Sequence, residues 1–276
     1  MFTLNCKGRL LSAEKPLVMG IINTTPDSFF EGSRQPATTA LLQKAAQMLA
    51  EGASILDIGG QSTRPGSHLL SQEEELQRVI GPIAALHRQL PEAVISVDTF
   101  YAKVAAEAVA AGASIVNDIS GGEMDAGMLA TVAALKVPYI CMHMRGTPQT
   151  MQQYTQYDNL VKEVIDYFIS KLDNCKKAGI LDVVIDPGFG FAKTIAQNFA
   201  LLKDLSLLKI LDKPLLAGLS RKGTVYKTLG TTAEEALNGT TVLNTIALQN
   251  GASILRVHDV KEAVEAVTLY CEYLQA

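Results

Sequence analysis

The amino-acid sequence predicts a (β/α)8 TIM barrel with a short N-terminal hairpin or arm. Eight short apolar segments alternate with segments of helical periodicity along the 276 residues, a pattern typical of a parallel sheet covered by helices on both faces. The tetrapeptide GASI begins at residues 52, 112 and 251, each time where a predicted helix ends and a strand begins. Polar side chains follow the apolar segments, at the end of the barrel where active sites lie.

The predicted strands begin after a hairpin or arm over residues 1–16, in which Gly8 is a possible turn. The first strand, residues 17–23, ends before Pro26 and the pair Asp27-Ser28, because these residues do not continue a central strand. The other seven strands are predicted at residues 52–60, 93–99, 112–122, 138–143, 181–188, 214–220 and 254–259.

The predicted helices lie between these strands. The first covers residues 37–52 and ends at Gly52, and the second opens with a capping box at residues 71–74 and runs through Leu90. The others are predicted at 101–112, around 124–135, in a long segment that ends at Gly179, at 195–210, in a short segment after Lys222, at 234–250 and at the carboxyl end. A doubly wound open sheet is the rival fold, but it usually has a glycine-rich turn after its first strand, where this chain has NTTPDSFF.

Bulk composition limits the classes of function. We expect a single domain over residues 1–276. The formal net charge of −4 gives no electrostatic reason to expect a nucleic acid or an anionic membrane as a partner. The sequence shows neither a bilayer-spanning apolar stretch nor the long apolar core of a signal peptide. The four cysteines are scattered without metal-binding spacing, which favours free thiols and a cytoplasmic location.

The polar residues at the strand ends divide by chemistry. Asp98, Asn117 and Asp186 lie in apolar strands and need partners. Either a ligand with several N–H donors satisfies them, or Lys222 or Arg256 neutralises the two aspartates. A second group offers an amide oxygen, a hydroxyl and cationic donors, which suit a phosphate group with its magnesium ion: Asn23, Thr63, Arg64, Arg256 and His258.

Four other residues are either structural or part of the site. We interpret His143 and Asp57 as structural and not as ligand-binding, because single polar residues at such positions are usually hydrogen-bonded within the fold. Phe189 and Phe191 in DPGFGF belong either to the core or to a loop in which an aromatic ring covers a flat ligand.

Eight motifs together resemble the dihydropteroate synthases, the folate-pathway enzymes inhibited by sulfonamides. They occur in that family's order and span nearly the whole chain: GIINTTPDSF, DIGGQSTRPGS, SVDT, VNDISGG, CMHMRGTPQTMQ, DPGFGF, LSRK and RVHDV. The resemblance implies transfer of a dihydropterin methylene group from its diphosphate ester to the amine of 4-aminobenzoate, which gives 7,8-dihydropteroate and diphosphate. It also implies a homodimer, and sulfonamides as inhibitors.

The resemblance assigns roles to residues. Asp98, Asn117, Asp186 and Lys222 would read the pterin ring edge, with Met142 packed nearby. Asn23 would bind Mg²⁺, and Thr63, Arg256 and His258 would hold the diphosphate. Mobile loops over residues 24–36 and 61–70 would carry Asp27, Phe29, Arg64 and Pro65. Aminobenzoate would lie between these loops, Phe191 and the turn Ser220-Arg221-Lys222.

Two departures from the family pattern concern the aminobenzoate side and the second loop. The family commonly has serine after the Ser-Arg-Lys turn, where this chain has Gly223, and backbone N–H groups at a helix start would then bind the carboxylate. The family's usual glutamate in GGESTRPG is Gln61 here. The competing interpretations are a methyltransferase domain that uses methyltetrahydrofolate, and a catalytically silent pterin-binding homologue.

Overall fold

The structure, a computed structural model, describes residues 1–24, 34–61 and 69–276, and of residues 34–37 it describes the backbone alone. The described residues form one two-stranded and one eight-stranded sheet. The larger sheet consists of β3 (Leu17–Asn23), β4 (Ile55–Gly59), β5 (Ile95–Asp98), β6 (Ile115–Asp118), β7 (Tyr139–Met142), β8 (Val183–Asp186), β9 (Leu216–Ala217) and β10 (Ile254–Val257).

The eight strands close into a parallel barrel. Their order is β8-β7-β6-β5-β4-β3-β10-β9, and every paired neighbour is parallel. The ends of this order meet at a parallel bridge between Ile185 and Leu215, where the Ile185 N–H donates to the Pro214 carbonyl at 3.0 Å. This topology confirms the predicted (β/α)8 barrel.

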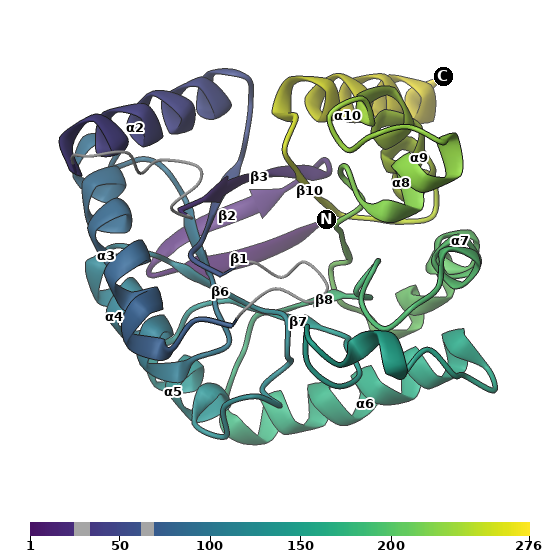
Figure 1. Ribbon diagram of the computed structural model, residues 1–276, viewed down its shortest axis with the longest axis horizontal. Helices are drawn as coiled ribbons and strands as arrows, with labels where there is room; N and C mark the ends of the chain where they lie inside the picture. The colour runs from purple at the N-terminus through teal and green to yellow at the C-terminus, as the bar shows by residue number, and fades with distance from the viewer. Residues whose placement is uncertain (25–33, 62–68) are drawn as a thin grey trace.

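Helices surround the strands, as Figure 1 shows. They are α2 (Arg34–Ala50), α3 (Gln72–Gln89), α4 (Ala102–Ala111), α5 (Met128–Leu135), α6 (Leu160–Ala178), α7 (Ile195–Lys203), α8 (Gly223–Leu229), α9 (Leu237–Gln249) and α10 (Val260–Gln275), with 3₁₀ segments η1 (Met151–Gln153) and η2 (Leu205–Leu211). The predicted capping box opens α3, where Ser71 Oγ accepts from the Glu74 N–H at 3.3 Å and Glu74 Oε2 accepts from the Ser71 N–H at 2.8 Å. The helix expected at 195–210 is instead divided into α7 and η2.

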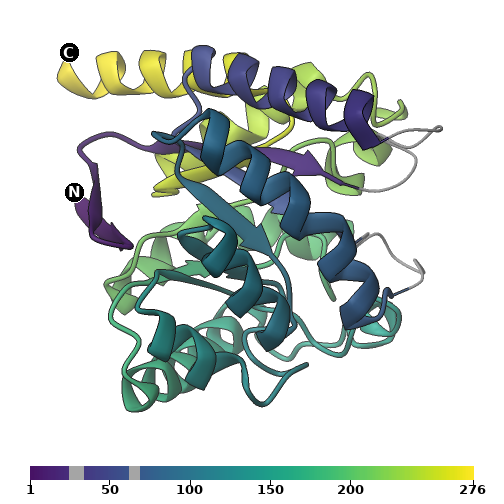
Figure 2. The same ribbon diagram turned by 90° about the vertical axis from the view of Figure 1, so that its left-hand side faces the viewer.

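The predicted N-terminal hairpin closes the end of the barrel where the strands begin. Strands β1 (Phe2–Cys6) and β2 (Arg9–Ala13) pair antiparallel, and Lys7 and Gly8 turn between them with φ of 54° and 88°. Figure 2 shows the hairpin at one end of the molecule, with the β3 arrow pointing away from it. The hairpin packs on a layer of apolar side chains from the starts of the strands: Met19, Ile55, Ile115, Ile140, Val184, Leu216 and Ile254.

Candidate active site

The interior of the barrel changes from apolar to polar between its two ends. Because alternate residues of a strand share a face, the residues two positions beyond the apolar layer also face the interior. In β4, β6, β8 and β10 these residues are Asp57, Asn117, Asp186 and Arg256. Asp118 and Cys141 have the opposite parity, and the Asp118 carboxylate accepts four hydrogen bonds from Ser120, Gly122 and Tyr139. The polar layer therefore lies at the carboxyl ends of the strands.

Arg256 is the centre of a buried cluster of charges. Its Nε donates to Asp57 Oδ2 at 2.7 Å, and its Nη2 donates to Asp98 Oδ2 at 2.6 Å. Asn117 Nδ2 also donates to Asp57 Oδ2, at 3.0 Å. Burial raises the pKa of the Asp98 carboxyl, and the Arg256 guanidinium opposes that shift. The contact between Asn117 and Asp57 orients the amide, because it uses an amide N–H and leaves the Asn117 carbonyl oxygen as an acceptor for a ligand.

Asp186 and Lys222 form the second charged part of the layer. Asp186 Oδ1 accepts from the Gly188 N–H at 2.8 Å, and Lys222 Nζ donates to the Phe189 carbonyl. The Lys222 ammonium also lies 4.8 Å from the centre of the Phe191 ring. Burial raises the pKa of Asp186, whereas it lowers the pKa of Lys222 to about 8. Each group opposes the other's shift, so the pair is a carboxylate acceptor beside a cationic donor.

An apolar wall adjoins these charges. Met142 and Phe191 are both buried and belong to one cluster with Phe100, Ile119, Met144, Met151 and Ala192. Phe189 is buried in the main core, and Phe191 is buried beside Lys222. Both fit the core interpretation of DPGFGF, and contact of an aromatic ring with a ligand stays a prediction. A flat apolar ligand has a hydrophobic surface here next to hydrogen-bonding groups.

Ser220 and His258 lie together near the end of β10. Ser220 Oγ lies 3.0 Å from His258 Nδ1 and accepts from the His258 backbone N–H at 3.1 Å. His258 is exposed, so its ring is accessible to a ligand at the mouth. Asn23, at the end of β3, is partly buried and pairs in register with Gly59.

The Arg221 side chain is engaged within the protein. Its Nε and Nη2 donate to both carboxylate oxygens of Asp259 at 2.8 and 2.7 Å. Its Nη1 donates to the carbonyls of Ala233 and Glu234 at 3.0 and 2.8 Å. The left-handed backbone at Arg221, with φ of 53°, accompanies this arrangement. The structure therefore brings Ser220 and Lys222 to the mouth but commits the Arg221 guanidinium to Asp259.

Several predicted site residues lie outside the described residues. They are Asp27, Phe29, Thr63, Arg64 and Pro65. Gln61 precedes the second of these segments and is buried. Its amide accepts from the Leu70 N–H at 3.0 Å, donates to the Leu70 carbonyl at 3.2 Å, and donates to Glu75 at 2.8 Å. An amide makes all three bonds, whereas an ionised glutamate at this position has no donor for the last two.

Two buried residues beside the site were not identified as functional from the sequence. Asp57 was interpreted as structural, yet it bonds both Arg256 and Asn117. Asp57 lies two residues after Ile55 of the apolar layer and therefore faces the barrel interior, but the sequence of β4 alone does not show which face points inward. Lys193 was not considered, and it lies 2.9 Å from His143 Nδ1. His143 is buried in this contact, with its ring edge-on to Tyr167.

The polar layer combines acceptors for N–H donors with cations for an anion, next to an apolar wall. A (β/α)8 barrel with this layer at the strand ends is a ligand-binding enzyme scaffold of the TIM-barrel class. Within the described residues no group of three or more His, Cys, Asp and Glu side chains is arranged to hold a metal ion. In the same ranges no helix is long and apolar enough to cross a membrane.

Comparison with known proteins identifies the family. Residues 19–258 match the model of the pterin binding enzyme family. Dihydropteroate synthase of Synechocystis sp. is 44% identical over 95% of this chain and 90% of its own length. The Yersinia pestis enzyme in complex with a sulfonamide drug superposes with a TM-score of 0.92, 40% identity and 99% coverage of both chains. The Xanthomonas albilineans enzyme with 4-aminobenzoic acid gives 0.91, 42% identity, and 99% and 98% coverage.

The chain therefore belongs to the pterin-binding enzymes and, within them, to the dihydropteroate synthase family.

Proposed function

We propose that the protein condenses (7,8-dihydropterin-6-yl)methyl diphosphate with 4-aminobenzoate to give 7,8-dihydropteroate and diphosphate. The observation that carries this proposal is the polar layer inside the barrel, which holds acceptors for ring N–H groups together with the Arg256 guanidinium, and which has His258 at its mouth. Family membership supplies the reaction, and the layer supplies a place for each part of the substrate. Sulfonamides are expected to compete at the aminobenzoate position.

The pterin ring edge is assigned to Asp98, Asn117 and Asp186. A pterin carries several N–H donors on one edge, and these three side chains offer oxygen acceptors in the interior. Burial raises the pKa of both Asp98 and Asp186. Because ionised carboxylates are costly to bury without donors, N–H donors from a ligand would favour the ionised form of each. Met142 would pack against the pterin ring system, and Phe191 would pack against the aminobenzoate beside it.

The diphosphate is assigned to Arg256 and His258, with Thr63 as a further ligand. A guanidinium has five N–H donors, and the described carboxylates of Asp57 and Asp98 accept one each from Nε and Nη2. The remaining donors of the fork would be directed to the leaving group. Arg256 would thereby stabilise the charge that develops when the bond to the diphosphate breaks.

Magnesium fits the same side of the mouth. Mg²⁺ is usually held by one or two protein oxygens together with substrate phosphates and water, and the Asn23 amide at the end of β3 offers such an oxygen. When bound, the ion would neutralise part of the charge on the diphosphate.

We propose a dissociative substitution. The bond from the pterin methylene carbon to the diphosphate oxygen breaks first, and the electron pair leaves with the diphosphate. The aminobenzoate nitrogen then bonds to the methylene cation and loses a proton to solvent or to the diphosphate. Fixed charges are sufficient for this sequence, and no covalent bond to the protein is required.

Product formation tests the function. Dihydropteroate is measured after incubation of the protein with the pterin diphosphate, Mg²⁺ and aminobenzoate, with each component omitted in turn. A synthase forms product only with all substrates present. If no aminobenzoate-dependent product forms at any enzyme concentration, the proposal fails. Pterin binding without turnover would identify the silent homologue, and methyl transfer from methyltetrahydrofolate would identify the methyltransferase.

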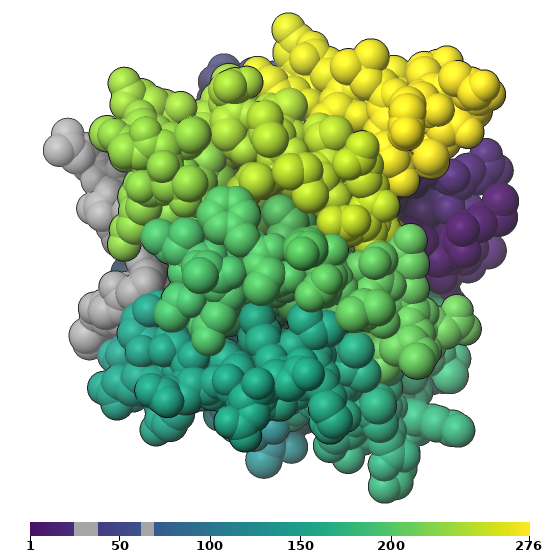
Figure 3. Space-filling model, turned by 90° about the vertical axis from the view of Figure 1, so that its right-hand side faces the viewer, coloured from purple at the N-terminus to yellow at the C-terminus, as the bar shows by residue number. Residues whose placement is uncertain are grey.

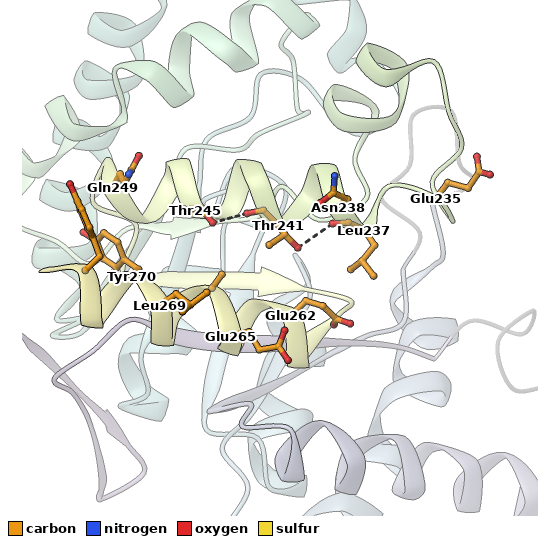
Figure 4. Close-up of a pocket in the computed structure, with 12 residues that line it drawn as sticks. Glu235, Leu237, Asn238, Thr241, Thr245, Gln249, Glu262, Glu265, Leu269 and Tyr270 are labelled. Atoms are coloured by element: carbon orange, nitrogen blue, oxygen red, sulfur yellow. Dashed lines mark hydrogen bonds between the residues drawn. The ribbon is translucent and has the colours of Figure 1, made fainter. Parts of the chain in front are cut away.

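We also propose that the protein is a homodimer formed through α9 and α10. These helices lie side by side on one face of the molecule (Figure 3) and border a groove of about 690 Å³. Figure 4 shows Thr241 and Thr245 on α9 and Leu269 and Tyr270 on α10 along this groove. Leu269 is 71% exposed, so a second copy would remove a large apolar side chain from water.

The free thiols of the described cysteines agree with a cytoplasmic location.

A further inference from the structure

Lys193 is a buried cation bound by neutral groups. It follows the loop after β8 and is 3% exposed. Its ammonium lies 2.9 Å from His143 Nδ1, 3.1 Å from the Gly188 carbonyl and 3.0 Å from the Phe191 carbonyl. Among the described residues no carboxylate lies within ion-pair distance of it. An ammonium has three N–H donors, and these three acceptors match them.

The loop from Pro187 to Ala192 needs such a fixed point. Gly188, Gly190 and Ala192 have left-handed backbone, with φ of 71°, 83° and 50°. For the alanine this conformation is uncommon and costs free energy, so surrounding contacts must enforce it. Asn198 holds the loop from α7, where its Oδ1 accepts from the Gly190 N–H at 2.7 Å. Lys193 also holds the loop, through the carbonyls of Gly188 and Phe191.

The same loop carries contacts of the candidate active site. The Gly188 N–H donates to Asp186 Oδ1 at 2.8 Å, while the carbonyl of Gly188 accepts from Lys193. The Phe189 carbonyl accepts from Lys222, and the Phe191 ring lies beside the same ammonium. Lys193 therefore holds the residues that orient both members of the Asp186 and Lys222 pair.

The charge of Lys193 is also close enough to affect this pair. Burial lowers the pKa of Lys193 to about 7, and Asp186 opposes that shift. Conversely, burial raises the pKa of Asp186, and Lys193 is one of the cations that oppose the rise. Its loss would remove both a support of the loop and a positive charge near the carboxylate.

We propose that Lys193 is a positioning residue for the pterin site, which fixes the loop from Pro187 to Ala192 so that Asp186 and Lys222 face the ligand in their binding geometry. The inference rests on the proposed function only for the identity of the ligand. It predicts that removing the ammonium weakens pterin binding although Lys193 itself does not touch the ring.

Calorimetry with the pterin diphosphate and Mg²⁺, without aminobenzoate, tests the proposal. Lys193→Met removes charge and donors, and Lys193→Gln keeps donors but removes the charge. Lys171→Met is the matched control, because Lys171 is 8% exposed but pairs with Glu123 and the Tyr167 ring. We expect the Kd to rise at least about tenfold in Lys193→Met and less in Lys193→Gln. A displaced Asp186 or Lys222 would lose about one hydrogen bond between a charged group and the ring, which is worth about that factor or more.

The control is expected to lose thermal stability while its Kd stays within about twofold of wild type. Equal Kd values for wild type and the Lys193 variants would overturn the proposal, as would an equal loss in Lys171→Met. If Lys193→Met does not fold, Lys193→Gln decides. A crystal structure of Lys193→Met provides a test that does not depend on the ligand: an unchanged loop from Pro187 to Ala192 would overturn the inference even if wild type binds no pterin.

Discussion

Asp186→Asn is expected to separate ligand binding from stability. The carboxylate is 6% exposed, and among the described residues one of its oxygens accepts from Gly188. Asparagine can keep the Gly188 bond through its carbonyl oxygen. Its amide nitrogen then faces the pterin N–H groups, so a donor replaces the acceptor that the ring requires.

The size of the effect follows from these contacts. One or two charge-assisted hydrogen bonds to the ring are lost, each worth about 1.5–3 kcal/mol. A loss of about 3 kcal/mol corresponds to a rise in Kd of roughly 150-fold. Stability is expected to change the other way. Burial raises the pKa of Asp186, so its ionised form disfavours folding at pH values above the pKa of the unfolded chain, and a neutral asparagine removes that cost.

Asp118→Asn is the matched control. Asp118 is as deeply buried, at the end of β6, but its four hydrogen bonds lie on the outer face of the barrel. Asp118→Asn should lower the thermal midpoint and leave pterin affinity within about threefold of wild type, because the bonds that it breaks go to Ser120, Gly122 and Tyr139 and not to residues assigned to the pterin. Calorimetric Kd and thermal unfolding are measured for both variants. Unchanged affinity in Asp186→Asn, or a stability loss equal to that of Asp118→Asn, would refute the reasoning.

Four further predictions concern the other parts of the site and the surface. Arg256→Ala should lower kcat by about 10²-fold or more through lost stabilisation of the diphosphate, and a wild-type rate at saturating Mg²⁺ and substrate would contradict this. Because Lys222 is charged below its pKa of about 8 and neutral above it, pterin diphosphate affinity should fall as pH rises through 8; a flat profile in wild type, or the same fall in Lys222→Arg, would argue against that role. Gly223→Ser should lower the KM for aminobenzoate, since the nearest atoms to an added Cβ are 3.7 Å away and leave room for the hydroxyl; an unchanged KM would mean that the backbone already supplies the contact. Leu269→Glu should give monomers in analytical ultracentrifugation, and an intact dimer would place the interface elsewhere.

Much of the fold is readable from the sequence because each apolar run ends at a polar residue or glycine. The strand positions and the Ser71 capping box follow from local signals that packing reinforces. The helix expected over 195–210 fails for a physical reason. Leu205 and Leu208 are buried three residues apart, a spacing that serves a 3₁₀ helix as well as an α-helix, so the periodicity does not distinguish the two.

The site is less readable, because side-chain partners depend on geometry that one strand does not show. In a buried parallel strand both faces are apolar, so the sequence of β4 does not reveal that Asp57 points inward. Register around the barrel brings Asp57 to Arg256, 199 residues away. Arg221 shows the opposite case. It follows a strand end, where a contact with the ligand was predicted, but its guanidinium pairs with Asp259 within the protein. The contacts of Lys193 are not predictable from the sequence either, because its partners are the backbone carbonyls of Gly188 and Phe191.

The most direct test of the central claim, that the polar layer of the barrel divides between ring and diphosphate, is a crystal structure with a dihydropterin, diphosphate and Mg²⁺ bound. The ring edge should lie within about 2.7–3.2 Å of Asp98, Asn117 and Asp186 oxygens or nitrogens. The diphosphate should contact Arg256 and His258, with the metal on Asn23. A ring bound outside this layer, or a diphosphate bound on the Asp186 side, would contradict the account.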